Sequence, residues 1–345
     1  MSRTLAPANL FQAMLAITNG FARTRFGAIA VMLGALCGMA GAAAAAERRI
    51  EFENGDLYVG ELVDGERTGR GTYTWANGSR YEGEFLANRR HGTGVFTWPD
   101  GRRYEGQFAD AARHGHGLFI WLDGRRYDGQ FENGKRSGTG TLTWPNGDRY
   151  EGQFANNRMH GEGMLVLHDT GRYEGPFFNG RMHGAGVFTW PDGRRYEGQF
   201  ADGNKAGLGT LTWPNGNLYR GEFDADERTG LGILFWRDGT VFHGHFAAGA
   251  MQGYGVKRTP DGARELQQWQ RGNLVWAQAL VEQERCRLWM LDRRWMFDGE
   301  SCINGLAHGR GLAVSLDGDY IVVDGHFVLG RLVRGSPEPL KLADS

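Results

Sequence analysis

The 345-residue chain has few cysteines, few prolines and no excess of either charge, with three cysteines, nine prolines and a formal net charge of −1. Three cysteines without a CxxC pair exclude a disulfide-rich scaffold and argue against a structural zinc site. A near-neutral chain without a Lys/Arg cluster has no electrostatic reason to bind nucleic acid or an anionic membrane surface. An aromatic content of 12% argues against a disordered chain.

Only residues 26–46 form an apolar run long enough to cross a membrane, and no acid precedes it. Arginines stand before the run, and the alanines that end it fit a small-residue cleavage site before Glu47. We therefore predict that residues 1–46 are a signal peptide and that the chain is exported, to the periplasm. The alternatives are an inner-membrane anchor through residues 26–46, and a true start at Met14, which would shorten the leader.

The two cysteines outside this leader are Cys286 and Cys302. In an exported chain, two cysteines suggest one disulfide, which would contribute about 3 kcal/mol in the chain-entropy model. The alternative is a pair of buried free thiols.

Glycine, in contrast, is abundant, with 56 residues, and much of it belongs to a strict 23-residue period. A glycine follows each periodic aromatic residue by two positions, and a phenylalanine follows by four positions in all units but the first. The periodic aromatic residues are Tyr58, Tyr81, Tyr104, Tyr127, Tyr150, Tyr173, Tyr196, Tyr219 and Phe242.

Each unit has the pattern of a β-hairpin. Residues 103–108 alternate polar and aromatic side chains, which predicts a strand, and residues 117–121 predict a second strand. Residues 109–115 are polar and predict the turn between them, and Asp123-Gly124 predicts the turn into the next unit. Hairpins chained in this way predict an all-β protein with an elongated, single-layer antiparallel sheet, about 85 Å long at 4.8 Å per strand.

Strand alternation predicts one aromatic face and one polar face on this sheet. The aromatic columns either form the structural core or bind a partner, and stacking in the core is the simpler use. The candidate residues of this face are Tyr81, Phe85, Trp98, Tyr104, Phe108, Trp121, Tyr127, Phe131, Trp144, Tyr150, Phe154, Tyr196, Phe200 and Trp213.

The motifs Tyr81-Glu82-Gly83-Glu84-Phe85 and His91-Gly92-Thr93-Gly94, repeated with a period of 23, resemble MORN (membrane occupation and recognition nexus) repeats. The resemblance covers nine units and implies an extended, twisted sheet of hairpins. It also implies scaffolding, homodimerisation, binding of a partner protein and binding of phospholipid. The predicted export and the lack of an attached catalytic domain depart from the usual setting of the family.

The period predicts four segments: a leader (1–46), nine repeats (47–264), diverged repeats that form a cap (265–335) and a disordered tail (336–345). The alternative for 265–335 is a partner-specific module. Within it, Ala277–Leu288 has the composition of a short helix. The rest is expected to be small and irregular.

Three sets of polar residues are candidate sites of chemistry. A column of carboxylates has one member per repeat, each placed two residues after a basic residue. This pattern favours a solvent-exposed ladder of ion pairs over the paired catalytic carboxylates of a glycosidase. A histidine column is replaced by alanine in another unit, which indicates turn residues, and His243 with His245 lacks a third zinc ligand. The carboxylates are Glu82, Glu105, Asp128, Glu151, Glu174 and Glu197, and the column histidines are His91, His114, His160 and His183.

No catalytic, cofactor-binding or metal-binding constellation is evident. We therefore expect a non-enzymatic repeat scaffold that binds a protein partner, self-associates, or does both through its sheet surface. The alternative is a peripheral protein that binds phospholipid at a membrane, and a cell-wall or carbohydrate-binding protein is the third reading. No cofactor and no nucleic acid is expected, and a homodimer would hide the apolar face.

Overall fold

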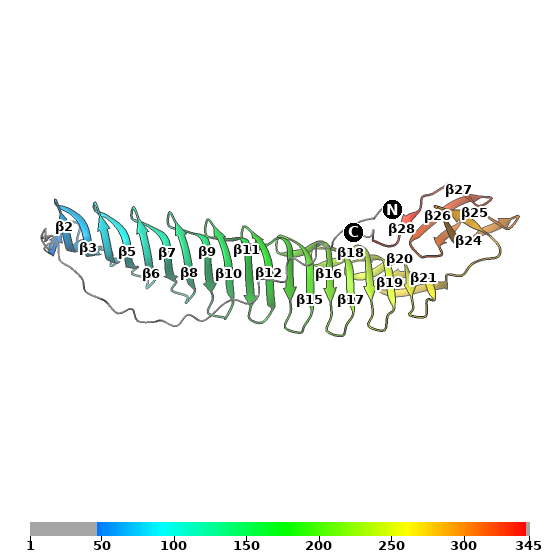
Figure 1. Ribbon diagram of the computed structural model, residues 1–345, viewed down its shortest axis with the longest axis horizontal. Coiled ribbons are helices and arrows are strands. Elements are labelled where there is room, and N and C mark those ends of the chain that lie inside the picture. The colour runs from blue at the N-terminus through cyan, green and yellow to red at the C-terminus, as the bar shows by residue number, and fades with distance from the viewer. Residues whose placement is uncertain (1–46, 343–345) are drawn as a thin grey trace, which may run out of the picture. The chain divides into compact units, whose positions relative to one another are not determined.

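The computed structural model describes residues 47–342, and every regular element in this range is a β-strand. The predicted all-β class and the long antiparallel sheet of hairpin repeats are confirmed (Figure 1). The strands of the large sheet are β1 (Arg48–Glu51), β2 (Leu57–Val63), β3 (Glu66–Thr74), β4 (Arg80–Leu86), β5 (Arg89–Thr97), β6 (Arg103–Ala109), β7 (Ala112–Ile120), β8 (Arg126–Glu132), β9 (Lys135–Thr143), β10 (Arg149–Ala155), β11 (Arg158–Leu167), β12 (Gly171–Phe178), β13 (Arg181–Met182), β14 (Gly184–Thr189), β15 (Arg195–Ala201), β16 (Asn204–Thr212), β17 (Leu218–Asp224), β18 (Glu227–Phe235), β19 (Val241–Ala247), β20 (Ala250–Arg258), β21 (Arg264–Gln270) and β22 (Asn273–Ala279).

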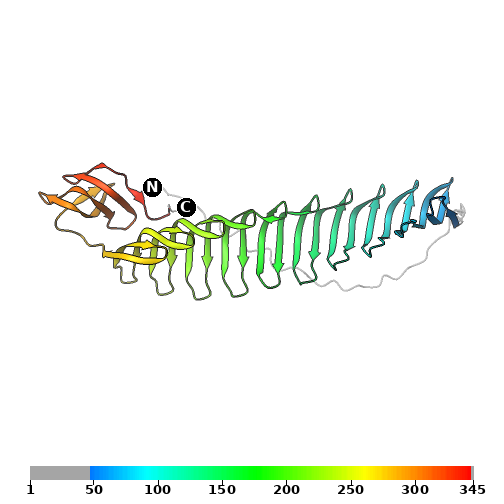
Figure 2. The same ribbon diagram turned by 180° about the vertical axis from the view of Figure 1, so that it is seen from behind.

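Successive strands pair antiparallel in chain order, so the large sheet is a meander with turns along both edges (Figures 1 and 2). In the hairpin of β6 and β7, Tyr104 lies opposite Phe119 and Gly106 opposite Gly117, followed by a register shift. The same shift after the glycine pair recurs in most of the other hairpins. Bulges bend a strand and increase its twist, so the sheet bends along its glycine rows.

The turn between the two strands of a unit is shorter than residues 109–115. It consists of Asp110 and Ala111, whose φ angles are 49° and 66°, and β7 already begins at Ala112. Two consecutive positive φ angles are typical of a type I′ turn, whose twist matches that of the flanking strands. Three histidines of the predicted turn column, His91, His114 and His160, therefore lie in strands and not in turns, and His183 lies in the break between β13 and β14.

The sheet has its core on one face. The periodic tyrosines are fully buried, and the phenylalanines that follow them are 3–5% exposed. Glycine makes this burial possible, because a Cβ atom on Gly117 would lie 2.4 Å from the Tyr104 hydroxyl oxygen. Each periodic tyrosine ring lies across the glycine pair of its own hairpin.

The region after residue 264 differs from the expectation in its helix, in its irregular part and in its tail. The large sheet continues through β21 and β22, so Ala277–Leu288 is not a helix. Instead of an irregular region, a second sheet follows, drawn in orange and red in Figure 1. Its strands are β23 (Leu288–Met290), β24 (Arg293–Ile303), β25 (Leu306–Ser315), β26 (Tyr320–Val328), β27 (Arg331–Arg334) and β28 (Glu338–Pro339).

The second sheet repeats the pairing of the large one. Gly311 lies opposite Gly299 on one side and opposite Gly325 on the other, as the repeat glycines do. The tail from Ser336 is not disordered over its described part, because β28 pairs with β26 and Leu340 is fully buried. Residues 343–345 lie outside the described range.

Candidate functional site

The two faces of the large sheet carry different side chains. We call the face of the tyrosines and phenylalanines the core face, and the opposite face, which carries Glu82, Val95 and their equivalents, the groove face. All fourteen predicted aromatic residues lie on the core face. Their tyrosines and phenylalanines are buried, and Trp98, Trp121, Trp144 and Trp213 are partly buried against them.

The core-face rings form a continuous zigzag. Tyr104 makes edge-to-face contacts with Phe108 of its own unit and Phe131 of the next, both with ring centroids 5.1 Å apart. Each tyrosine hydroxyl also donates to the carbonyl three residues later, as Tyr104 does to Gln107 at 2.8 Å. Burial raises the pKa of Tyr104 to about 12, so the phenol is neutral at ordinary pH. A partner cannot reach these rings without opening the sheet.

A column of cations on the core face was missed in the sequence. The Arg113 guanidinium lies 4.9 Å from the Phe119 ring centroid and 5.3 Å from that of Phe131, and it donates to the Gly134 carbonyl at 2.6 Å. Burial lowers the pKa of Arg113. A basic residue nine positions after the tyrosine, replaced only by methionine, was the available signal. The column consists of Arg67, Arg90, Arg113, Arg136, Met159, Met182, Lys205, Arg228 and Met251.

The groove face carries the predicted charge ladder. Arg80 and Glu82 are 2.7 Å apart, Arg103 and Glu105 are 2.7 Å apart, and equivalent pairs join Glu151, Glu174 and Glu197 to the arginine two residues earlier. The sixth carboxylate, Asp128, faces His116 Nε2 at 3.1 Å. These side chains are half exposed, so each pair contributes at most about 1 kcal/mol.

The groove face is hollowed over the first repeats. A cavity of about 720 Å³ has Val59, Thr72 and Val95 in its wall together with several glutamates. The Glu84 carboxylate accepts hydrogen bonds from the Thr93 hydroxyl at 2.6 Å and the Thr93 N–H at 3.0 Å, which lower the pKa of Glu84. This end of the groove face is therefore polar and acidic.

The groove face becomes apolar toward the last repeats. The position before the periodic aromatic residue is an arginine in the second to seventh units, Leu57 in the first, and Leu218 and Val241 in the eighth and ninth. Phe235 pairs with Leu218 and Val241, which gives one apolar row across three strands. Ile233 lies beside His243, which in turn pairs with Val256. Phe235 is 36% exposed, and Leu208 on the adjoining strand is 54% exposed.

Where this apolar row ends, the second sheet covers the groove face. Val256 and Leu266 are fully buried in one cluster with Met296, Val314 and Ile321 of the second sheet. A Cβ atom on Gly318 would lie 2.9 Å from a Val256 methyl carbon, so the two sheets meet closely. The chain itself therefore shows that the groove face accepts aliphatic side chains.

His243 lies at the same contact. Its Nε2 is buried, and burial lowers the pKa of His243 against the opposing attraction of Asp319. Within residues 47–342, no group of three or more His, Cys, Asp or Glu side chains could hold a metal ion. His243 and His245 thus gain no third ligand from the described chain.

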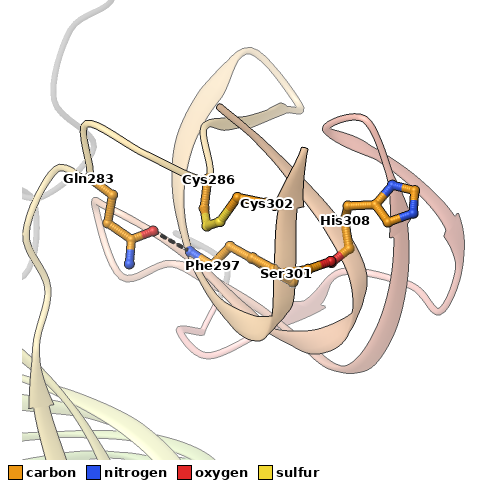
Figure 3. Close-up of a disulfide and its surroundings, with 6 residues drawn as sticks. All are labelled: Gln283, Cys286, Phe297, Ser301, Cys302 and His308. Carbon is orange, nitrogen blue, oxygen red and sulfur yellow. Dashed lines mark hydrogen bonds between the residues drawn. A yellow bond between two sulfur atoms is a disulfide. The ribbon is translucent and has the colours of Figure 1, made fainter. Parts of the chain in front are cut away.

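Cys286 and Cys302 form the predicted disulfide, with their Cα atoms 5.0 Å apart (Figure 3). It ties the segment between the two sheets to β24. Nearby, the Gln283 side chain accepts a hydrogen bond from the Phe297 N–H at 3.1 Å, and Ser301 donates to the His308 carbonyl at 3.2 Å.

The predicted signal peptide or anchor, residues 1–46, lies outside the described residues. In residues 47–342 no helix is long and apolar enough to cross a membrane.

A scan against protein-family models matches the MORN repeat nine times in succession. The matched ranges are 58–80, 81–102, 104–124, 127–149, 150–172, 173–194, 196–218, 219–241 and 242–264. The chain belongs to the MORN repeat family. This MORN repeat protein therefore carries a non-catalytic type of repeat over more than half of its length.

Solved structures with partial likeness to this MORN repeat protein include the SAS-4 (dCPAP) TCP domain of Drosophila melanogaster, in complex with a proline-rich motif of Ana2 (dSTIL). That match has 15% identity, covers 44% of this chain and 83% of that chain, and has a TM-score of 0.30. The TCP10 domain of Danio rerio CPAP has 16% identity, 67% and 99% coverage and a TM-score of 0.23. TM-scores this low carry no argument about function. No curated protein matches the chain.

Proposed function

We propose that this MORN repeat protein is a non-enzymatic scaffold that binds a partner protein on the apolar stretch of its groove face. The stretch consists of Leu208, Leu218, Leu231, Ile233, Phe235 and Val241. The observation that supports it is the second sheet, which already covers the adjoining part of the same face with aliphatic side chains.

The core face is a poor candidate for the same role. Its tyrosines and phenylalanines are buried in the chain's own core, so binding there would cost the repeat packing. From the second to the seventh unit the groove face carries half-exposed ion pairs, whose charges must lose water when a partner binds. The aliphatic side chains of the apolar stretch take no part in the repeat core and continue an existing interface, and the charged residues beside them on this face are Arg220, opposite Ile233, and Glu222, opposite Leu208.

The partner is expected to offer aliphatic side chains from an extended segment or a sheet face, as Met296, Val314 and Ile321 do in the second sheet. Burying apolar area contributes about 25 cal/mol per Å². Fully buried aliphatic anchors are therefore expected to dominate the affinity.

The test compares the unchanged full chain with a double variant and a single control variant. Ile233→Glu with Phe235→Glu places charge in the apolar stretch, and Leu122→Glu changes a turn side chain that is 74% exposed. A protein captured from the native compartment should be identified, purified and titrated against all three. At least a tenfold loss of affinity in the double variant, with Leu122→Glu unchanged, is expected.

Equal binding to all three forms would overturn this site. Light scattering on the same variants would reveal a second copy as the occupant if the double variant alone turned a dimer into a monomer. Flotation with anionic vesicles would reveal a lipid surface if only the double variant failed to float.

We also propose that this scaffold works in the periplasm after export. The leader-like residues 1–46 and the pairing of Cys286 with Cys302 support this, because disulfides persist in oxidising compartments. Cell fractionation with N-terminal sequencing tests it. A mature chain that begins near Glu47 is expected, whereas an intact leader in the membrane fraction would indicate the anchor, and a cytoplasmic chain would overturn the proposal.

A further inference from the structure

The second sheet contains a cavity of about 580 Å³ that the scaffold function does not use. Its wall is partly apolar, with Leu288, Trp295, Leu306 and Leu316. Leu288 and Trp295 are 4% and 3% exposed, so this part of the wall belongs to the sheet's own core. The volume lies within the range of small-molecule sites, about 300–1,000 Å³.

Backbone hydrogen bonds hold three distant segments together at this cavity. The Arg287 N–H donates to the Gly305 carbonyl at 2.8 Å, and the Ala307 N–H donates to the Arg287 carbonyl at 3.2 Å. The Gly330 N–H donates in turn to the Ala307 carbonyl at 2.8 Å. The disulfide at Cys286 fixes the residue that precedes Arg287. The wall is therefore built by covalent and backbone bonds and does not depend on a loose loop.

Three arginines line the cavity, and only one of them is neutralised. Arg294 binds both carboxylate oxygens of Glu282, at 2.6 and 2.7 Å. Arg287 and Arg331 form no ion pair with any carboxylate in residues 47–342. The cavity thus combines a partly apolar wall with two arginines that form no ion pair, and the Glu282 carboxylate, paired with Arg294, also lines it.

Two exposed apolar side chains also line the cavity. Trp289 is 60% exposed and Leu329 is 45% exposed, and both line the cavity. Large apolar side chains exposed beside a cavity are typical of a binding site.

We propose that this cavity binds a small organic anion with an apolar body, in which a carboxylate or phosphate ester carries an aliphatic chain. Guanidinium groups bind carboxylates and phosphates through paired, charge-assisted hydrogen bonds, and here Arg287 and Arg331 supply them. The aliphatic chain lies against Leu288, Leu306 and Leu316. The site lies apart from the apolar stretch of the groove face, so it does not depend on the proposed scaffold function.

The test is calorimetric titration of the disulfide-bonded protein with four probes, of which the two amphiphilic anions are kept below their critical micelle concentrations. The probes are octanoate, octyl phosphate, octanol and inorganic phosphate. Saturable binding of octanoate or octyl phosphate is expected, at least tenfold tighter than that of octanol or phosphate. The stronger of the two anions identifies the headgroup.

Matched arginine variants locate the site. Arg287→Gln with Arg331→Gln is expected to weaken binding at least tenfold. Arg334→Gln, at an exposed position on the same strand as Arg331 but outside the cavity, is expected to leave it unchanged. Both proteins should first show the same thermal unfolding.

A second readout does not rely on the variants. The Trp295 indole N–H donates to the Met290 carbonyl at 2.9 Å, and its NMR signal should shift as the anion binds to the unmodified protein. The proposal is overturned if octanol binds as tightly as the anions, if no probe binds at millimolar concentration, or if neither the arginine variants nor the Trp295 signal responds.

Discussion

The glycines of one repeat serve two different physical purposes. In the hairpin of β8 and β9, a Cβ atom on Gly140 would lie 2.6 Å from the Tyr127 ring, whereas Gly134 has φ of 78° and open space around it. Gly140 leaves room for the tyrosine ring, and Gly134 adopts the positive φ that the turn requires.

Alanine substitutions should separate these purposes. Gly140→Ala is expected to destabilise the protein by about 2–3 kcal/mol, because the buried Tyr127 ring must move. Gly134→Ala is expected to cost about 1 kcal/mol for the left-handed backbone alone. Denaturant unfolding monitored by tryptophan fluorescence measures both, and equal losses would contradict this account.

At the residue scale, the sequence predicted the tyrosine, phenylalanine and glycine columns because their period is strict. It did not predict the cation column, because arginine is read as a surface residue unless its neighbours are known. Methionine at the same position in three units was the available sign that this side chain packs in apolar surroundings. The cavity in the second sheet had no signal, because its arginines and leucines come from five separate places between residues 287 and 331 without a common spacing.

At the scale of the element, each hairpin contacts the next through the cation column, the position nine residues after the periodic aromatic residue. Arg113 contacts rings of its own unit and of the following unit, and its donor reaches Gly134 across 21 residues. Methionine fills the same position in three units with a flexible apolar side chain.

Arg113→Met should therefore be tolerated, with a loss below about 1 kcal/mol, whereas Arg113→Ala should cost about 2 kcal/mol. Alanine loses both the packing of the stem and the hydrogen bond to Gly134. Thermal unfolding of the two variants checks this. If Arg113→Met proved the worse of the two, the charge would matter more than the packing.

The helix predicted over Ala277–Leu288 is absent for a reason at the same scale. Ala277–Leu288 has residues that favour a helix, but Ala277–Ala279 belong to β22 and pair with β21, and residues 280–287 lie in no helix or strand. Local propensity loses to tertiary pairing here, as it commonly does for short segments.

At the scale of the whole molecule, stability should come from contacts between neighbouring repeats. Excision of residues 104–126 removes 23 residues and joins Arg103 to Tyr127. Phe131 then takes the place of Phe108, and the Gly134 carbonyl takes the place of that of Ala111 as acceptor for Arg90. A folded protein with a slightly lower melting temperature is expected.

Excision of residues 104–125 is the control. It leaves one extra residue, so the chain must lengthen a tight turn or move its aromatic residues to the groove face. Its melting temperature should fall well below that of the 23-residue excision. Equal melting temperatures would show that the period does not set the register.

The nine repeats and their antiparallel sheet were predictable because every unit repeats the same local signals. For the second sheet the sequence indicated only diverged repeats and an irregular remainder, because the period is interrupted there. One of the two buried clusters in which this sheet takes part also includes Val256 and Leu266, and that contact has no sequence signal. The apolar stretch of the groove face was visible as substitutions in the arginine column. Its meaning required knowing that the next part of that face is covered.

The groove face is acidic over the first repeats and apolar over the last, and its last part is closed by the second sheet. Its two ends are therefore chemically unlike. A long partner with one basic end and one aliphatic end would fit in only one of two opposite orientations. The order of the repeats would then fix the orientation in which an extended ligand binds along the sheet.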